Sequence, residues 1–234
     1  ALMLGALGLL GATPATSVTT STGIVFTGGS GADALTGGTG RDSFTGNAGN
    51  DVLDGGSNID TAIFSGTRAS YTVSVSFGTI TVADTVAGRD GTDTLTNIER
   101  VKFSDVSVAF DTSGDAGMAY RLYKAAFNRS PDQAGLGFQM TALDDGMSLS
   151  QLASNFIASP EFRTKYASLS NVQFVDQIYQ NVLHRGGDSA GVAYHLARLD
   201  SGVGRNDVLA GFSESPENQA ALIGTIQNGM VFTV

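Results

Sequence analysis

The chain lacks cysteine and tryptophan, and only four of its 234 residues are proline. Without cysteine no disulfide can form, and no thiolate can act as a nucleophile or a metal ligand. Basic residues are also few, since 13 Lys and Arg stand against 22 Asp and Glu, and the net charge is −9. This balance argues against nucleic acid and anionic membrane as partners, because both are polyanions.

A hydrophobic segment long enough to cross a bilayer is also missing. The apolar run over residues 1–10 is shorter than the roughly 20 residues that a membrane span needs. It is similar to the apolar part of a signal peptide, but no basic residue precedes it. We therefore read residues 1–22 as an apolar segment and linker that continue an upstream element of a longer protein.

Glycine, by contrast, is abundant, and it is concentrated in four consecutive blocks of nine residues over 28–63. Each block carries one aspartate at its sixth position: Asp33, Asp42, Asp51 and Asp60. The pattern Gly-Gly-x-Gly-x-Asp-x-apolar-x is that of a calcium-binding parallel β-roll. The alternative is a flexible Gly/Ser/Thr linker, but a linker has no reason to repeat aspartate every nine residues.

The spacing of the blocks itself calls for a cation. Two blocks make one coil, so Asp33 should lie over Asp51, and Asp42 over Asp60. Stacked strands are about 4.8 Å apart, and two carboxylates at that distance repel by roughly 3.5 kcal/mol at an effective dielectric of 20. Ca²⁺ removes this repulsion, and it accepts carboxylate and carbonyl oxygens at flexible angles.

The turns between the expected strands supply the rest of the predicted site. Asparagine, which tolerates left-handed backbone angles, replaces glycine at two turn positions. Phe26 should stack on Phe44, and Leu35 on Leu53, while Ile24, in the place of an aspartate, should cap the roll. The predicted turn residues of the metal sites are Gly29, Gly31, Gly38, Gly40, Asn47, Gly49, Gly56 and Asn58.

Residues 65–111, which follow the roll over 23–64, alternate between apolar and polar residues and predict a small β cap on the open end of the roll. Residues 84–96 read as a polar loop. Asp90 and Asp93 in this loop are candidate ligands of another calcium ion, or else solvated aspartates of a polar turn.

The hydrophobic period changes from two to 3.6 after a linker over 112–117, so residues 118–234 predict a helical domain. Residues 118–170 match residues 174–226 at a constant offset, which indicates two copies of one unit. The predicted fold is therefore mixed β and α and multidomain: a short parallel calcium β-roll with a β cap, then an all-α domain of two repeats.

Each helical copy carries the same start and stop signals. Asp132 and Asp188 stand at expected N-caps, Gly146 and Gly202 at expected helix ends, and Ser-Pro-Glu at 159 and 215 predicts a further helix start. Arg129 and Arg185 each precede the capping aspartate by three residues. We expect each arginine to form a local ion pair with that aspartate, the alternative being a ligand-binding arginine.

Residues 90–105 resemble the stretch that follows the nonapeptide repeats of RTX-type secreted proteins. Residues 118–222 resemble a bacterial domain of unknown function, through Tyr-x-x-x-(Leu/Phe)-x-Arg-x-x-Asp-x-x-Gly and Ser-Pro-Glu in both copies. Residues 229–234 resemble the apolar ending of a type I export signal. The resemblance implies a secreted, extracellular or cell-surface protein whose partners are calcium ions, the type I secretion machinery, and like subunits or other surface components.

We expect no enzymatic activity, because the sequence offers no catalytic set. His184 and His195 align with Asn128 and Gln139 and are read as polar surface residues. The favoured function is a surface-layer-like structural protein whose repeats fold in extracellular calcium. The alternative is the non-catalytic C-terminal module of a secreted enzyme or adhesin, which a catalytic motif or long repeats upstream of residue 1 would favour.

Overall fold

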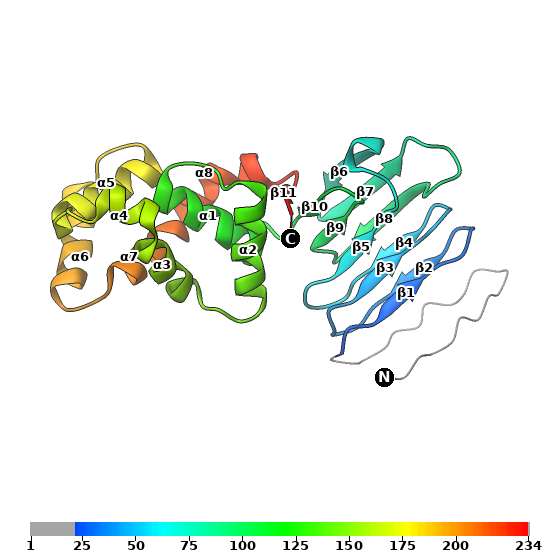
Figure 1. The fold of residues 1–234 in the computed structure, drawn as a ribbon, viewed down its shortest axis with the longest axis horizontal. Helices are drawn as coiled ribbons and strands as arrows, with labels where there is room; N and C mark the ends of the chain where they lie inside the picture. The colour runs from blue at the N-terminus through cyan, green and yellow to red at the C-terminus, as the bar shows by residue number, and fades with distance from the viewer. Residues whose placement is uncertain (1–21, 234) are drawn as a thin grey trace. The chain divides into compact units, whose positions relative to one another are not determined.

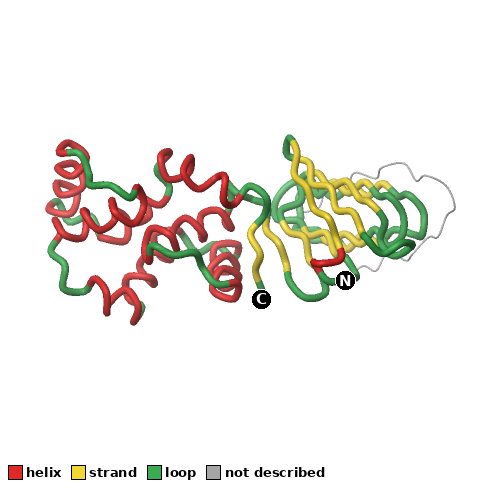
Figure 2. The backbone as a smooth tube through the Cα atoms, turned by 90° about the horizontal axis from the view of Figure 1, so that it is seen from above, coloured by secondary structure: helices red, strands yellow, loops and turns green. Residues whose placement is uncertain are grey.

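The computed structural model describes residues 22–233, and the chain divides between Phe110 and Asp111 into two compact units. The first unit carries strands β1 to β10, and the second carries helices α1 to α8 (Figures 1 and 2). The predicted upstream segment over residues 1–22 lies, except for its last residue, outside the described residues. No helix within residues 22–233 has the length and apolar character of a membrane span.

Each glycine-rich block ends in a strand of three residues, because the glycines occupy the turn and the last residues of the block are extended. The strands alternate between two sheets: β1, β3 and β5 pair in parallel in one sheet, and β2 pairs in parallel with β4 in the other. They span Val25–Thr27 (β1), Ala34–Thr36 (β2), Ser43–Thr45 (β3), Val52–Asp54 (β4) and Thr61–Ile63 (β5).

Strands β1, β2 and β3 each pair with the strand two blocks further along the chain, as predicted. Phe26 pairs with Phe44, and their rings stack with centroids 4.9 Å apart and planes within 4°. Leu35 likewise pairs with Leu53. Phe44 and Leu53 are fully buried and join the apolar core of the first unit.

The stretch read as a polar loop over 84–96 contains a strand, so that prediction was wrong. Strand β8 (Thr92–Thr96) pairs in parallel with β4, and β9 (Arg100–Lys102) pairs in parallel with β5. The two strands thus add a third coil to the stack. Polar residues hid β8 because its exposed side is all threonine, while Asp93 and Leu95 point inward and are fully buried.

A hairpin separates the second coil from the third. Strands β6 (Tyr71–Ser76) and β7 (Thr79–Asp84) pair antiparallel, and β7 pairs antiparallel with β8. Strand β10 (Ser107–Ala109) pairs antiparallel with β9. Within the first unit the two sheets therefore run β1-β3-β5-β9-β10 and β2-β4-β8-β7-β6.

The helices of the second unit recur at the predicted offset. Helix α1 begins at Asp115, inside the predicted linker, and α1 and α2 have the same lengths as α5 and α6, their counterparts in the second copy. The helices are α1 (Asp115–Phe127), α2 (Gln133–Asp144), α3 (Leu149–Ala158), α4 (Pro160–Tyr166), α5 (Asn171–Leu183), α6 (Ser189–Asp200), α7 (Arg205–Ser213) and α8 (Pro216–Ile226).

The predicted helix signals are confirmed in both copies. The carboxylates of Asp132 and Asp188 cap α2 and α6 by accepting the backbone N–H of Gly135 and of Gly191, at 2.7 and 2.8 Å. Ser159 and Ser215 cap α4 and α8. Gly146 and Gly202 both have φ of +94°, which a residue with a Cβ rarely adopts.

The predicted ion pairs within the turns are wrong, because the capping aspartates are held by helix N-termini. Arg129 instead pairs with Glu161 of the first Ser-Pro-Glu, at 2.8 Å, and Arg185 pairs with Glu217 of the second, at 3.1 Å. Each arginine therefore ties the turn between two helices to the start of a later helix, through a glutamate 32 residues further along the chain.

His195 is not a surface residue, contrary to the prediction from its alignment with Gln139. Its ring is half-buried and stacks on Phe212 at 4.2 Å, and Tyr179 meets it edge-on. Burial lowers the pKa of His195, with Arg198 adding to the effect. His184 behaves as its match Asn128 does, since both end a helix in the left-handed conformation.

The last described residues form β11 (Met230–Phe232), in the segment that resembles an export signal. Met230 and Phe232 are buried. The backbone N–H of Thr233 donates to the carbonyl of Gln133 at 3.2 Å, so the tail lies against the start of α2.

Candidate metal centre

The aspartates of alternate blocks form two columns, one on each side of the coils. In the first column the N–H of Asp33 donates to the carboxylate of Asp51 at 2.8 Å, and the N–H of Asp51 donates to that of Asp93 at 2.8 Å. Each carboxylate therefore points at the preceding coil, which agrees with the predicted stacking of Asp33 over Asp51.

The second column repeats this arrangement. The carboxylate of Asp42 accepts the N–H of Ile24 at 2.7 Å, and the carboxylate of Asp60 accepts the N–H of Asp42 at 2.7 Å. The column ends at Glu99, whose Oε2 accepts the N–H of Asp60 at 2.9 Å. Ile24 thus stands at the first described position of the column, where the sequence predicted a cap.

Burial leaves some of these oxygens without a partner. Asp51 is 1% exposed and Asp60 0%, and in each the buried Oδ2 has no hydrogen-bond partner among the described residues. A buried carboxylate oxygen without a partner is costly, because it loses water and gains nothing in return. These two oxygens are the place where a cation would be most stabilising.

The same burial shifts the titration of the columns. Burial raises the pKa of Asp60 to about 7, and the carboxylates of Glu99 and Asp42 add to the effect. Burial also raises the pKa of Asp93 to about 7, with Asp51 the first of the neighbouring carboxylates that contribute. The pKa of Asp51 shifts in the same direction, through burial and then Asp33. Stacked carboxylates therefore resist ionisation unless a positive charge joins them.

Backbone carbonyls lie beside the columns. The carbonyl oxygens of Gly46 and Gly55 lie 2.6 and 2.3 Å from the points where a Cβ on Gly28 and on Gly37 would stand. Only glycine permits that approach. Within residues 22–233 no three Asp, Glu, His or Cys side chains gather in one cluster. A cation held here would draw carboxylates from two coils and complete its shell with carbonyls, a donor set that suits Ca²⁺.

The other predicted turn residues have several roles. The amides of Gly29 and Gly38 donate to the aspartate of their own block, at 2.6 and 2.9 Å. Asn47 and Asn58 have φ of 65° and 79°, as predicted, and their side chains donate to carbonyls of the preceding coil. The remaining predicted turn glycines pack in the stack itself: Gly49 lies over Gly31, Gly56 over Gly38, and Gly40 beside Thr22.

Asp90 and Asp93, predicted as ligands of one further calcium ion, lie in different parts of the structure. Asp93 is the last member of the first column. Asp90 accepts hydrogen bonds from the N–H and hydroxyl of Ser65, at 2.9 Å each, and from the hydroxyl of Tyr71. The oxygens of Asp90 are thus engaged in bracing the hairpin, where burial and Asp90 raise the pKa of Tyr71 to about 12.

The sequence analysis did not identify Glu99, because this residue does not follow the nine-residue spacing of the aspartates. Its separation from Asp60 is 39 residues, more than twice the separation of Asp60 from Asp42. The available signal was its place three residues after Thr96, the last residue of β8, but that strand itself was read as a loop.

Comparison with known families supports this picture. Residues 27–62 match the RTX calcium-binding nonapeptide repeat in 4 copies, and residues 153–222 match a domain of unknown function, DUF4214. No curated protein matches the chain. The chain therefore contains RTX calcium-binding repeats, which are typical of secreted proteins, and its ion is Ca²⁺.

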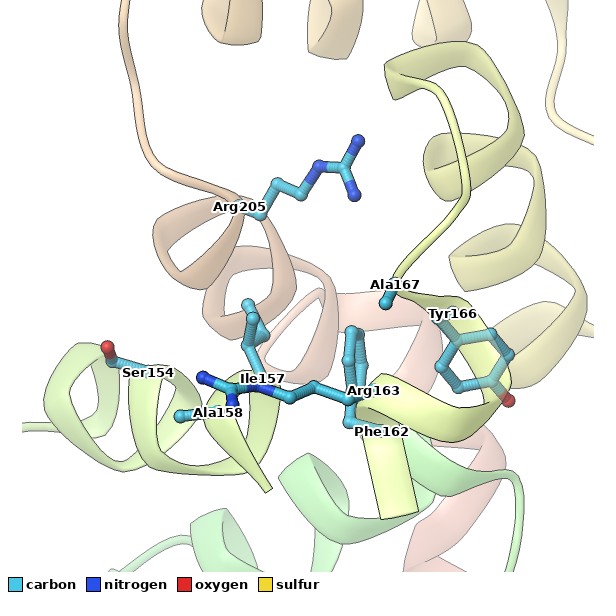
Figure 3. Close-up of a pocket in the computed structure, with 8 residues that line it drawn as sticks. All are labelled: Ser154, Ile157, Ala158, Phe162, Arg163, Tyr166, Ala167 and Arg205. Carbon is cyan, nitrogen blue, oxygen red and sulfur yellow. The ribbon is translucent and has the colours of Figure 1, made fainter. Parts of the chain in front are cut away.

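The helical unit has a hollow of about 330 Å³ between α3, α4 and α7 (Figure 3). Arg163 and Arg205 line it, but Arg205 extends away from Ser154, donates to the carbonyl of Leu169 at 2.7 Å and lies over the ring of Phe174. Arg205 therefore braces the loop between α4 and α5.

Proposed function

We propose that this chain is the calcium-dependent part of an exported cell-surface structural protein, similar in role to a surface-layer protein. The observation that carries the proposal is the pair of buried carboxylate columns. Calcium would be held between Asp33 and Asp51 and between Asp42 and Asp60, with carbonyls of the glycine turns completing the shell.

Calcium coupling gives the repeats a switch suited to type I export. At the low calcium of a cytosol, the desolvated carboxylates repel each other and the three-residue strands have little core to hold them. In millimolar calcium outside the cell, the free energy of ion binding becomes free energy of folding. The β-roll then forms on the outer side only.

The helical unit would serve export, assembly or contact with neighbouring subunits. We infer that it arose by duplication, because the first residues of the helices and the two Arg–Glu pairs recur at one constant offset. No enzymatic role is proposed for it.

A calcium titration followed by circular dichroism, with magnesium as control, tests the folding switch. We expect β structure to appear with calcium and not with magnesium, which is smaller and demands a stricter octahedral shell. Asp51→Ala should raise the calcium concentration at the midpoint. A signal that does not change with calcium would refute the switch.

Sedimentation at millimolar calcium and binding to cells test the surface role. Assembly or cell binding supports it. A chain that stays monomeric and does not bind cells would refute it, and would favour the alternative of a non-catalytic C-terminal module of a secreted enzyme or adhesin.

A further inference from the structure

We propose that calcium also binds one coil beyond the four repeats, where Asp93 and Glu99 each close one column around an additional ion. This inference rests on the proposed function of the columns as calcium sites. Both residues lie outside residues 27–62, the segment that matches the repeat family.

The hydrogen bonds of the third coil repeat those of the repeats. Asp93 accepts the N–H of Asp51 at 2.8 Å, the distance at which Asp51 accepts that of Asp33. Glu99 accepts the N–H of Asp60 at 2.9 Å, where Asp60 accepts that of Asp42 at 2.7 Å. The parallel pairing of β8 with β4 and of β9 with β5 fixes this placement.

The backbone of the third coil continues that of the repeats on both sides. In the first column, Gly91 packs on the carbonyl of Gly49, as Gly49 packs on that of Gly31. In the second column, the carbonyl oxygen of Asn97 lies 2.0 Å from the point where a Cβ on Gly55 would stand. The carbonyl oxygen of Gly55 has the same position relative to Gly37. Each added interval therefore contains both a second carboxylate and stacked carbonyls.

Glutamate compensates for a shorter turn. Six residues, 55–60, connect β4 to β5, whereas three residues, 97–99, connect β8 to β9. The extra methylene of Glu99 lets its carboxylate reach the backbone N–H of Asp60. One coil earlier, the shorter side chain of Asp60 accepts the N–H of Asp42 in the same way.

The unpartnered oxygens belong to the aspartates that the third coil adjoins. In the first two blocks, the N–H of Gly29 or Gly38 satisfies Oδ2 of the aspartate. In the fourth block, the N–H of Gly56 donates to Asp54 instead, at 3.2 Å. Asp51 and Asp60, each with a carboxylate in the coil on either side, keep a buried Oδ2 without a partner among the described residues.

Counting bound ions in the whole chain by native mass spectrometry, with equilibrium dialysis against calcium, tests the inference. Four hydrogen bonds from the backbone N–H of an aspartate to the carboxylate of the next coil mark four intervals between acidic residues, and these predict four ions in the wild type. Asp93→Asn and Glu99→Gln should each lose one ion, because the amide oxygen keeps the hydrogen bond but removes the charge. Asp105→Asn, an exposed carboxylate of the same unit, should lose none.

Variants that keep the wild-type count would overturn this inference and leave the repeat sites in place. A wild type that binds no calcium would overturn the proposed function as well. Circular dichroism at saturating calcium checks that each variant folds. Should one fail to fold, the wild-type count decides: more than two ions support the third coil, and two or fewer overturn it.

Discussion

The repeat coils bury carboxylates beside their apolar side chains, whereas none of the described buried residues of the helical unit is acidic. In the coils, Asp42, Asp51 and Asp60 are at most 2% exposed, and strands of three residues surround them. In the helical unit the interior is mostly aromatic and aliphatic, and every described helix except α1 and α7 begins with a side-chain cap. Under the proposed function, the helical unit should hold itself together through this interior, whereas the coils should depend on an ion from solution.

Removal of calcium by a chelator should have the largest effect on the difference in stability between the coils and the helical unit. With EGTA in place of calcium, we expect the amides of β1 to β5 to lose hydrogen-exchange protection, because the carboxylates repel without the ion, while α1 and α5 stay protected. Hydrogen exchange with mass spectrometry reads the two regions separately. Equal protection of the coils with and without calcium would remove the distinction.

A cavity in the helical core should have a large effect that calcium does not reverse. Phe156 is 4% exposed and packs against Tyr123 and Phe127 at 5.2 Å. Phe156→Ala should cost about 3–5 kcal/mol of unfolding free energy. Denaturant unfolding followed by helical circular dichroism measures it. Phe138→Ala is the control, because that ring is 72% exposed and its loss should change stability by less than about 0.5 kcal/mol.

Acid should stabilise the calcium-free coils. The pKa values of Asp60 and Asp93 are raised to about 7, so the folded coils bind protons that the unfolded chain releases. Their contribution is fully present below about pH 4, the unfolded pKa of aspartate, and is lost as the pH rises through about 7. Thermal unfolding of protein depleted of calcium by dialysis, in calcium-free buffer at pH 4.5 and pH 8, measures this.

With calcium bound, the pH dependence of coil stability has the opposite sign, because protons compete with the ion for the same carboxylate oxygens. The ion pair of Arg129 lowers the pKa of Glu161 to about 2, so the helical unit should keep that pair across this range. Calcium-free coils that melt at a higher temperature at pH 8 than at pH 4.5 would contradict the assignment.

The smallest expected effect is a difference in stability contribution between the Arg–Glu pairs of the two helical copies. The side chains of Arg129 and Glu161 are 40% and 32% exposed, whereas those of Arg185 and Glu217 are 47% and 55% exposed. Glu161→Gln should cost about 1 kcal/mol and Glu217→Gln less than about 0.5 kcal/mol, because water screens the more exposed pair. Chemical unfolding of both variants measures the difference, and equal costs would show that burial does not distinguish the pairs.

Sequence alone predicted the parts that follow a fixed period. The nine-residue spacing placed Phe26 on Phe44 and Asp42 over Asp60. The constant offset between the helical copies likewise placed the caps at Asp132 and Asp188. In both cases neighbouring residues determine the local geometry.

The parts that were missed depend on contacts distant in sequence. Strand β8 is extended because it pairs with β4, from which the whole hairpin separates it in the chain, and its threonines alone suggest a loop. Glu161 attracts Arg129 because Asp132 already caps a helix. The second helical copy has Leu183 and Asn218 at the positions where the first copy has the aromatic residues Phe127 and Phe162. With these two rings missing from the second copy, the ring of His195 turns inward and packs on Phe212.

The pairing of each strand with the strand two blocks away also sets the size of insertion or deletion that the coils can accept. Removing two blocks would withdraw one full turn and leave every later strand in its own sheet. Removing a single block would send each later strand to the opposite sheet, and the hairpin β6–β7 would then meet the wrong partner. Evolution can therefore lengthen or shorten this region only by pairs of blocks, in steps of about 4.8 Å.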